Sequence, residues 1–333
     1  MRIGLIGAGR IGAFHAATLQ QVAGVDAVVV ADADPARAKE LGGALGADTV
    51  ADVPTLYDEG VDGVVIAAAT DAHAGLIHQA LDEGVPVFCE KPVALDLDAT
   101  LGVVAHEAAA DVPVQMGFQR RFDHGYRAAR EALRSGALGW LHTLRAVTAD
   151  ESPPSAAYLQ TSGGLFRDCG IHDFDILRWL TGHEVVSVHA WGTDRGPDLY
   201  SGLGDVHTYT AVLRFDDDVL ATATATRYNG AGHDVRLEVS GSEGSRFVGL
   251  DDRAPITSAE EFLSWRQGLP YATFLERFND AYVAELIHFV DLVGEDAETP
   301  CTAADGLEAL YVAEACVRSY EAGTPVDVAD IRR

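Results

Sequence analysis

Lysine is nearly absent from this chain of 333 residues, which uses 22 arginines but only two lysines, Lys39 and Lys91. Lys91 lies in the sequence Glu90-Lys91-Pro92, directly after an apolar run that begins at Val85. Arginine stays protonated in proteins, whereas a lysine can be tuned to release its proton and can therefore act as an acid or a base. We expect Lys91 to serve a chemical role that a guanidinium group cannot fill.

Asp168 and His172 form a second candidate pair, because they are four residues apart and would lie on one face of a helix. Oxidation of an alcohol needs such a pair near a lysine, since the hydroxyl proton must leave to a base. Each residue also has a structural explanation, Asp168 as a helix N-cap and His172 as a core histidine bonded to Asp175 or the backbone. A metal site of His172, Asp173 and Asp175 is disfavoured, because their spacing points the side chains in different directions.

A glycine motif, Gly7-x-Gly9-x-x-Gly12, follows the expected strand 2–6 and opens the expected helix 11–19. Its glycines permit a tight turn and a close approach of the backbone to a pyrophosphate at the helix N-terminus. Asp32 lies twenty residues after Gly12, at the end of the next strand, which is the context that makes this motif a dinucleotide signature. A carboxylate there accepts hydrogen bonds from both ribose hydroxyls and repels a 2'-phosphate, so NAD is favoured over NADP. Arg37 could reach a 2'-phosphate, but we interpret it as an exposed helix residue.

The first part of the chain alternates apolar strands with helical patterns. Strands are expected at 2–6, 26–31, 61–68, 85–89 and 112–117. Apolar strands separated by helices predict a parallel sheet that is covered on both faces. We therefore predict a doubly wound α/β (Rossmann) domain over residues 1–120.

The pattern changes after Arg120-Arg121, which opens a predicted substrate-binding and oligomerisation domain over residues 121–333. A helix at 123–135 precedes longer strands with period-two alternation, expected at 141–148, 184–191, 206–215, 219–226 and in a hairpin over 237–249. Helices at 279–293 and 305–322 end the chain, the first with an apolar stripe of Tyr282, Leu286, Phe289 and Val293 and the second with Asp305 as its N-cap. This domain is predicted as an open, mainly antiparallel sheet with helices on one face, so its other face predicts an oligomer.

The composition excludes several classes of function. A net charge of -27 argues against a nucleic-acid partner, which requires basic surface. No apolar run approaches the roughly 20 residues that span a membrane, and the N-terminal stretch is too short and glycine-rich for a signal peptide, so a cytoplasmic protein is expected. The four cysteines show no Cys-x-x-Cys spacing, which disfavours a zinc site or a disulfide framework.

Four motifs in this order resemble one known family. They are the glycine motif, Glu90-Lys91-Pro92, the segment 115–123 and the segment 162–175, and together they resemble the glucose-fructose oxidoreductase/inositol dehydrogenase/rhizopine catabolism family over essentially the whole chain. The resemblance implies a Rossmann domain, an open-faced sheet domain that pairs subunits into homodimers or homotetramers, and a sugar or polyol substrate. It also implies that Lys91 contacts the reacting hydroxyl and the nicotinamide ribose, that Asp168 orients the substrate, and that His172 is the general acid/base.

The resemblance and the motifs together give two sets of expected site residues. The cofactor set is Gly7, Gly9, Arg10, Ile11, Gly12, Asp32, Arg37, Thr70, His73, Glu90, Lys91 and Gln119. The substrate set is Lys91, Arg121, Tyr158, Asp168, His172 and His233. No metal is expected in either set.

The chain is most similar to inositol 2-dehydrogenases within that family, through residues 162–175 and Pro153-Pro154. It departs from them at Thr148, Ala149 and Glu151, and at His233 where a tyrosine is usual. We expect oxidation of a secondary hydroxyl on a cyclic polyol or sugar, with myo-inositol first. Two alternatives stay open. One is a dehydrogenase or reductase for another sugar, keto-sugar, nucleotide sugar or sugar phosphate, for which Arg120, Arg121 and Arg227 could supply a local phosphate site. The other is a non-catalytic regulatory protein that binds a dinucleotide and a sugar.

Overall fold

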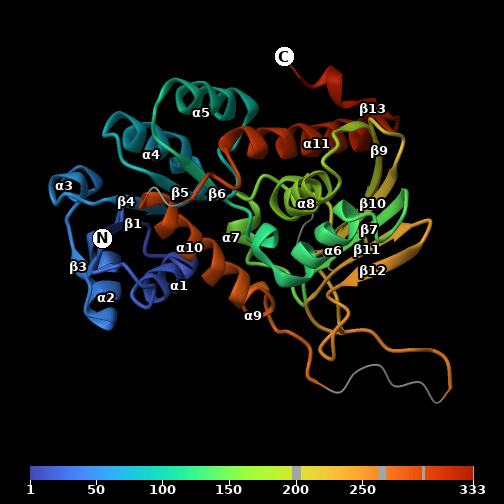
Figure 1. Cartoon of the computed structure of the whole chain (residues 1–333), viewed down its shortest axis with the longest axis horizontal. Helices are drawn as coiled ribbons and strands as arrows, with labels where there is room; N and C mark the ends of the chain where they lie inside the picture. Colours follow the sequence, from blue (N-terminus) through green and yellow to red (C-terminus); the bar gives the residue numbers. More distant parts are fainter. Residues whose placement is uncertain (197–203, 262–267, 295–296, 333) are drawn as a thin grey trace. The chain divides into compact units, whose positions relative to one another are not determined.

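A computed structural model describes residues 1–196, 204–261, 268–294 and 297–332 of the chain (Figure 1). Its internal contacts divide it into two compact units. The first unit combines Met1–Gln119 with Tyr282–Leu307, and the second combines Arg120–Ala281 with Glu308–Arg333. The first boundary lies where the sequence pattern changes, but residues 282–307 of the predicted second domain belong to the first unit.

The first unit contains a six-stranded parallel sheet in the order β3-β2-β1-β4-β5-β6. Its strands are β1 (Arg2–Ile6), β2 (Ala27–Ala31), β3 (Asp48–Thr49), β4 (Gly63–Ile66), β5 (Val87–Glu90) and β6 (Val114–Gly117). The chain order reverses between β1 and β4, and doubly wound sheets bind ligands outside the carboxyl ends of the strands at such a point. Five of these strands were predicted, and the two-residue β3 was not.

Helices connect these strands in the order α1 (Arg10–Leu19), α2 (Pro35–Leu45), α3 (Val53–Asp58), α4 (Thr70–Asp82) and α5 (Leu97–Ala109). Asp34, Asp52 and Asp96 cap α2, α3 and α5 by accepting a hydrogen bond from a backbone N–H of the first turn. Helix α1 has no side-chain cap and no acidic residue in its first turn. The N–H groups at the start of α1 are therefore left for another acceptor.

Helix α10 (Asn279–Val293) completes the core of the first unit although it comes late in the sequence. Leu286 and Phe289 are fully buried in one apolar cluster with strand residues such as Ile3 and Leu5. A methyl group at Gly63 would lie 2.6 Å from a Val293 side-chain carbon, so β4 and α10 pack too closely for any other residue there. Of the predicted stripe, Tyr282, Leu286 and Phe289 are confirmed as buried, and Val293 is partly buried against the same cluster.

The second unit contains a seven-stranded sheet in the order β12-β11-β7-β10-β9-β8-β13 (Figure 1). Its strands are β7 (Leu141–Ala149), β8 (Val185–Thr193), β9 (Thr208–Phe215), β10 (Leu220–Thr226), β11 (Asp234–Gly241), β12 (Gly244–Val248) and β13 (Val326–Asp327). Neighbouring strands are antiparallel except β10 and β7, which are parallel. The sheet is therefore mixed and mainly antiparallel, as predicted.

Helices of the second unit pack on one face of this sheet, with α6 (His124–Arg134) on β12 and α8 (Ile171–Thr181) on β7. The shorter helices are α7 (Ala156–Leu159) and α9 (Phe274–Arg277). Strand β9 shows the two faces clearly, because Tyr209, Ala211, Leu213 and Phe215 are buried while the residues between them are not. One face of the sheet thus contacts helices, and the alternate residues of β9, on the opposite face, are not buried by the part of the chain that the structure describes.

Helix α11 (Ala303–Ala322) begins two residues before the predicted start. Asp305, predicted as its N-cap, instead accepts a 2.9 Å hydrogen bond from the backbone N–H of Thr302, whose hydroxyl accepts from the Asp305 N–H at 3.2 Å. This reciprocal pair is a capping box in which Thr302 is the cap and Asp305 the third helical residue. The prediction of Asp305 as the N-cap was therefore wrong. Threonine and aspartate are both common N-caps, so residue type did not distinguish them.

Within the described ranges, none of the helices has the length and hydrophobicity that crossing a bilayer requires. The four cysteines carry free thiols, and Cys89, Cys301 and Cys316 are buried.

Candidate active site

The glycine motif forms the turn between β1 and α1. Gly7 has a φ of 107°, and a methyl group there would lie 2.6 Å from the Ala67 carbonyl oxygen, so glycine is required. A methyl group at Gly12 would lie 1.8 Å from the Gly7 carbonyl oxygen. A methyl group at Gly9 would meet nothing within 4 Å among the described residues. The first and third glycines thus let the backbone pack, and the second borders open space beside the uncapped start of α1, which fits a pyrophosphate.

Asp32 follows β2 and lies beside that turn. Its Oδ2 accepts a 2.7 Å hydrogen bond from the Ala8 N–H, and its Oδ1 accepts a 2.8 Å bond from the Asp34 N–H. These two bonds fix the carboxylate between the glycine turn and the start of α2. A ribose diol is a suitable hydrogen-bond partner for a carboxylate held in this way, so the residues present fit NAD.

Lys91 follows β5, and the residues on each side of it are anchored within the same unit. Oε1 of Glu90 lies 2.7 Å from Nε2 of His15 on α1. The Pro92 carbonyl oxygen lies 2.7 Å from Nδ1 of His73 on α4, and the Lys91-Pro92 peptide bond is cis. The other ring nitrogen of His73, Nε2, lies 3.2 Å from the Ala68 carbonyl oxygen. Burial lowers the pKa of His73, so the neutral ring has one N–H, and we assign it to the shorter contact, the one with Pro92.

Asp168 is a carboxylate of the second unit that two side chains hold in place. It lies in a π-helical turn, η2 (Phe166–Gly170), and accepts a 2.8 Å hydrogen bond from the Tyr158 hydroxyl. Its other oxygen accepts a 3.2 Å bond from Arg227, whose side chain is 1% exposed and also contacts Asp205 at 3.4 Å. Single π-turns inside helices are frequent at functional sites. The N-cap explanation for Asp168 is wrong, because this residue lies inside the turn.

His172 is the second residue of α8, which continues directly from the π-turn. It is half-buried, whereas Asp173 and Asp175 of the same helix are fully buried. Asp173 pairs with Arg120 and with the Thr148 hydroxyl, and Asp175 pairs with Arg121. Both aspartates thus neutralise arginines. Among the first residues of α8, His172 is the one whose side chain is accessible at the surface.

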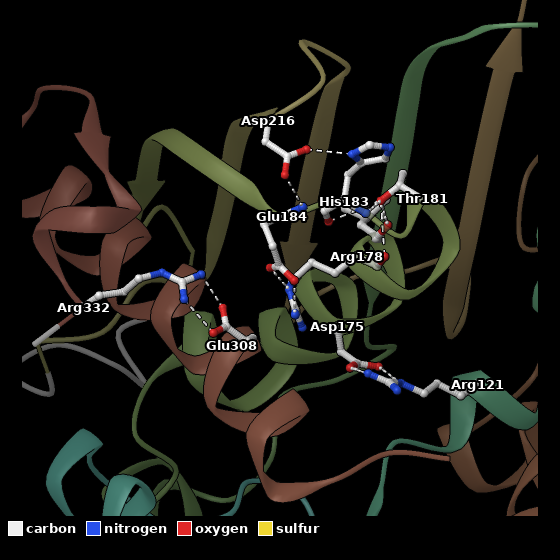
Figure 2. A network of polar contacts seen from close by, with 10 residues as sticks. Arg121, Asp175, Arg178, Thr181, His183, Glu184, Asp216, Glu308 and Arg332 are labelled. Carbon is white, nitrogen blue, oxygen red and sulfur yellow. Dashed lines mark hydrogen bonds and ion pairs between the residues drawn. The ribbon is translucent and has the colours of Figure 1, made fainter. Parts of the chain in front are cut away.

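Arg121 and Asp175 lie in a polar network of the second unit that also contains Arg178 and Glu184 (Figure 2). Arg121 is 5% exposed and donates to both oxygens of Asp175. With Arg120 on Asp173 and Arg227 on Asp168 and Asp205, each of the three arginines considered for a substrate phosphate is paired with aspartate. This pairing weighs against a phosphorylated substrate, and a direct substrate contact of Arg121 stays a prediction.

The other predicted residues have varied surroundings. Arg10, Ile11 and Thr70 lie at helix starts, and Arg37 is exposed beside Asp34. Gln119 is 3% exposed, and its Oε1 has no hydrogen-bond partner within the described parts of the chain. His233 is 3% exposed, with Nδ1 3.3 Å from Asp150. Their roles in binding stay predictions.

Sequence reasoning missed the contacts that orient these groups. Arg227 was considered only as a phosphate ligand, and Asp205 and His15 were not considered at all. A buried arginine requires a carboxylate partner, so Arg227 directly after a strand of alternating alanine and threonine was the available signal. Nothing in the spacing of His15 and Glu90, 75 residues apart, indicates their contact.

Comparisons with known proteins give consistent matches over the whole chain. The model of the "oxidoreductase family, NAD-binding Rossmann fold" matches residues 1–118, and that of the "GFO/IDH/MocA C-terminal domain" matches residues 126–246. An inositol 2-dehydrogenase of Rhizobium meliloti is 34% identical over 99% of both chains. A scyllo-inositol 2-dehydrogenase (NAD(+)) of Bacillus subtilis is 33% identical over 100% of this chain and 97% of its own. The crystal structure of scyllo-inositol dehydrogenase from Lactobacillus casei with NAD(H) and scyllo-inositol has a TM-score of 0.88 at 30% identity, covering 99% of both chains.

Proposed function

This chain belongs to the GFO/IDH/MocA oxidoreductase family, and on that premise we propose that it oxidises a secondary hydroxyl of a cyclic polyol, with inositol as the substrate and NAD as the cofactor. The observation that carries this proposal is the Asp168 carboxylate, which two donors fix in the turn that leads into His172. Myo-inositol is the first candidate, and the scyllo-inositol enzymes among its relatives make that stereoisomer the necessary comparison.

Three residues of this chain handle the substrate and its proton. Asp168 is held in place by Tyr158 and Arg227, so its carboxylate accepts hydrogen bonds from substrate hydroxyls and orients the ring. His172 takes the proton that leaves the reacting hydroxyl, a usual task of histidine in catalysis. Lys91 contacts the same hydroxyl and lowers the cost of its deprotonation. NAD, when bound, supplies the acceptor for the hydride.

The cofactor proposal depends on the glycine turn and Asp32. The uncapped start of α1 accepts the pyrophosphate, and the fixed Asp32 carboxylate accepts the adenosine ribose hydroxyls. A 2'-phosphate would place like charge against Asp32, which supports NAD rather than NADP.

The open face of the sheet in the second unit supports pairing with a second copy of the chain. One cross-strand row on this face has no buried member, and it consists of Phe247, Glu238, Arg145, Thr222, Val212 and His189. Phe247 is 55% exposed, and Trp191 on the same face is 56% exposed. Large apolar side chains on an open face favour an interface, so we propose a homodimer or homotetramer that works in the cytoplasm.

Replacing each lysine in turn tests the proposed chemistry. We expect Lys91→Arg to lower kcat for NADH formation from myo-inositol by about 100-fold or more, the usual effect of losing an acid/base group. The matched control is Lys39→Arg, because Lys39 is exposed on α2 and is the other lysine of the chain. Near-normal turnover by Lys91→Arg would exclude the proposed role. A wild-type protein that reduces no NAD with myo-inositol, scyllo-inositol or simple pyranoses would point to the regulatory alternative.

A further inference from the structure

A second buried polar cluster adjoins the Lys91 segment, and of its three residues only Glu90 was assigned a role above, as an expected cofactor contact. It consists of His15 on α1, Glu90 on β5 and Glu285 on α10, all within the first unit. One ligand atom from each residue lies within 4.8 Å of the other two. His15 and Glu285 are each 0% exposed. The cluster connects the helix opened by the glycine motif, the strand that precedes Lys91 and the helix that completes the core.

Glu285 is the unusual member of this cluster. Neither of its carboxylate oxygens has a hydrogen-bond partner among the residues that the structure describes. Its backbone carbonyl accepts a 2.9 Å bond from the buried Gln115 side chain on β6, so the helix turn that carries it is anchored. A carboxylate in such surroundings must hold a proton or meet a cation, because an isolated buried charge is too costly.

The charges around Glu285 favour the proton. Among the described residues, the titratable side chains that face it are Glu90 from β5 and His15 from α1. Gln115 from β6 is neutral, and His288 of α10 contacts its side-chain oxygen at 3.2 Å. Nε2 of His15 lies 2.7 Å from Glu90, so one carboxylate already occupies that ring nitrogen. A charged Glu285 would be a second anion competing for the same nitrogen.

The cluster is a poor site for a metal ion. The His15 nitrogen that faces it is at hydrogen-bond distance from Glu90, so its position suits a proton between the two groups. The other ring nitrogen, Nδ1, has no partner within the described ranges of the chain. Histidines that bind metals almost always donate this second N–H to an acceptor.

We propose that Glu285 is a positioning residue which, as the neutral acid, leaves His15 to pair with Glu90 alone and so fixes the segment that carries Lys91. Loss of its proton places a like charge beside Glu90 and divides His15 between two carboxylates. Because Glu90 precedes Lys91 directly, a displaced Glu90 side chain displaces the amine. This inference rests on the catalytic role proposed above for Lys91.

Three variants test the inference. Glu285→Gln keeps the shape and neutrality of the acid, Glu285→Ala removes both, and Glu107→Gln is the control, because Glu107 is a partly buried glutamate on α5 that bonds the Ala303 N–H instead. Wild type and variants are compared in kcat and KM for myo-inositol between about pH 6 and pH 9.5, in melting temperature, and in bound metal before and after EDTA.

We expect Glu285→Ala to lower kcat by about 10-fold or more with a smaller change in KM, since small misplacements of catalytic groups are costly. Glu285→Gln should restore kcat to within about 3-fold of wild type near pH 7, and should lose less activity than wild type at alkaline pH. Burial raises the pKa of Glu107 to about 7, so Glu107→Gln should change the pH dependence of the melting temperature but not that of kcat. A folded Glu285→Ala protein with wild-type kcat at every pH overturns the inference, and so does a stoichiometric metal that Glu285→Gln abolishes.

The two proposals fail in distinguishable ways. If the wild type oxidises no polyol, the proposed function fails. The melting temperatures of wild type and Glu285→Gln across the pH range still test whether Glu285 is neutral in the folded protein. If Lys91→Arg is inactive but Glu285→Ala is unaffected, only the positioning role is lost.

Discussion

The Tyr158 hydroxyl donates a 2.8 Å hydrogen bond to Oδ1 of Asp168, while Arg227 occupies Oδ2. Partial burial and then the Asp168 charge raise the pKa of Tyr158 above its ordinary value. The phenol therefore keeps its proton at neutral pH and remains a donor. The two donors together hold the Asp168 carboxyl group in one orientation before a substrate arrives.

Removing the tyrosine donor should loosen that orientation. Because one net hydrogen bond contributes about 0.5–1.5 kcal/mol, we expect Tyr158→Phe to lower kcat/KM for inositol by about 2- to 12-fold. Steady-state kinetics gives the effect, and a thermal melt provides the control, since Tyr158 is 46% exposed and its hydroxyl should contribute little to folding. An unchanged kcat/KM would mean that Tyr158 does not orient Asp168.

Removing Arg227 should affect folding as well as catalysis. Its guanidinium is 1% exposed between Asp168 and Asp205, so Arg227→Met leaves two carboxylates without their partner. Breaking a buried pair in this way typically costs about 3–5 kcal/mol. Urea unfolding should show that loss, whereas Arg214→Met, which removes an exposed pair with Asp218, should cost about 1 kcal/mol or less. Equal losses in the two variants would contradict a buried, structural charge pair at Arg227.

Replacing Asp32 should reduce the preference for NAD over NADP. We expect Asp32→Ala to raise KM for NAD by about 10-fold or more and to narrow the preference for NAD over NADP, because both the ribose acceptor and the like charge are removed. The control is Asp34→Ala, which removes the cap of α2 and should cost about 1 kcal/mol of stability without changing cofactor preference. If Asp32→Ala kept the wild-type ratio of kcat/KM with NAD to kcat/KM with NADP, that result would count against the proposed cofactor site.

The stability of the protein should depend on the pH through Glu285. Burial and then the Glu90 charge raise the pKa of Glu285 well above its ordinary 4.5. Below that ordinary value both the folded and the unfolded chain hold the proton, and no stability is lost. As the pH rises toward the folded-state pKa, only the unfolded chain releases the proton, so the free energy of unfolding falls. Glu285→Gln removes this loss.

Melting temperatures measured from about pH 5 to pH 8 check the direction of this change in stability. The stability of Glu285→Gln relative to wild type should increase as the pH rises through that range. A difference that stays constant, or that shrinks with rising pH, would show that Glu285 is ionised in the folded protein.

Sequence patterns predicted most elements of this fold because those elements depend on local chemistry. The bounds of helix α10, 279–293, and the glycine turn with Asp32 follow from apolar periodicity and from backbone sterics. The parallel pairing of β10 with β7 was not predicted, since alternation shows which residues share a face but not the direction of the neighbouring strand. Lys91, Asp168 and His172 were recognisable by type and spacing. Arg227 and Glu285 were not, because their roles depend on contacts between residues far apart in the sequence.

Helix α10 also bears on the order in which the protein can fold during synthesis. The strands that contact it, β1 and β4, leave the ribosome early, but Leu286 and Phe289, which cover their apolar side chains, are added more than 200 residues later. Many multidomain chains fold their N-terminal domain as soon as it has emerged. Here the growing chain keeps an uncovered apolar surface over β1 and β4 until nearly all of it has been translated. Acquisition of dinucleotide-binding ability should therefore be a late event in biosynthesis.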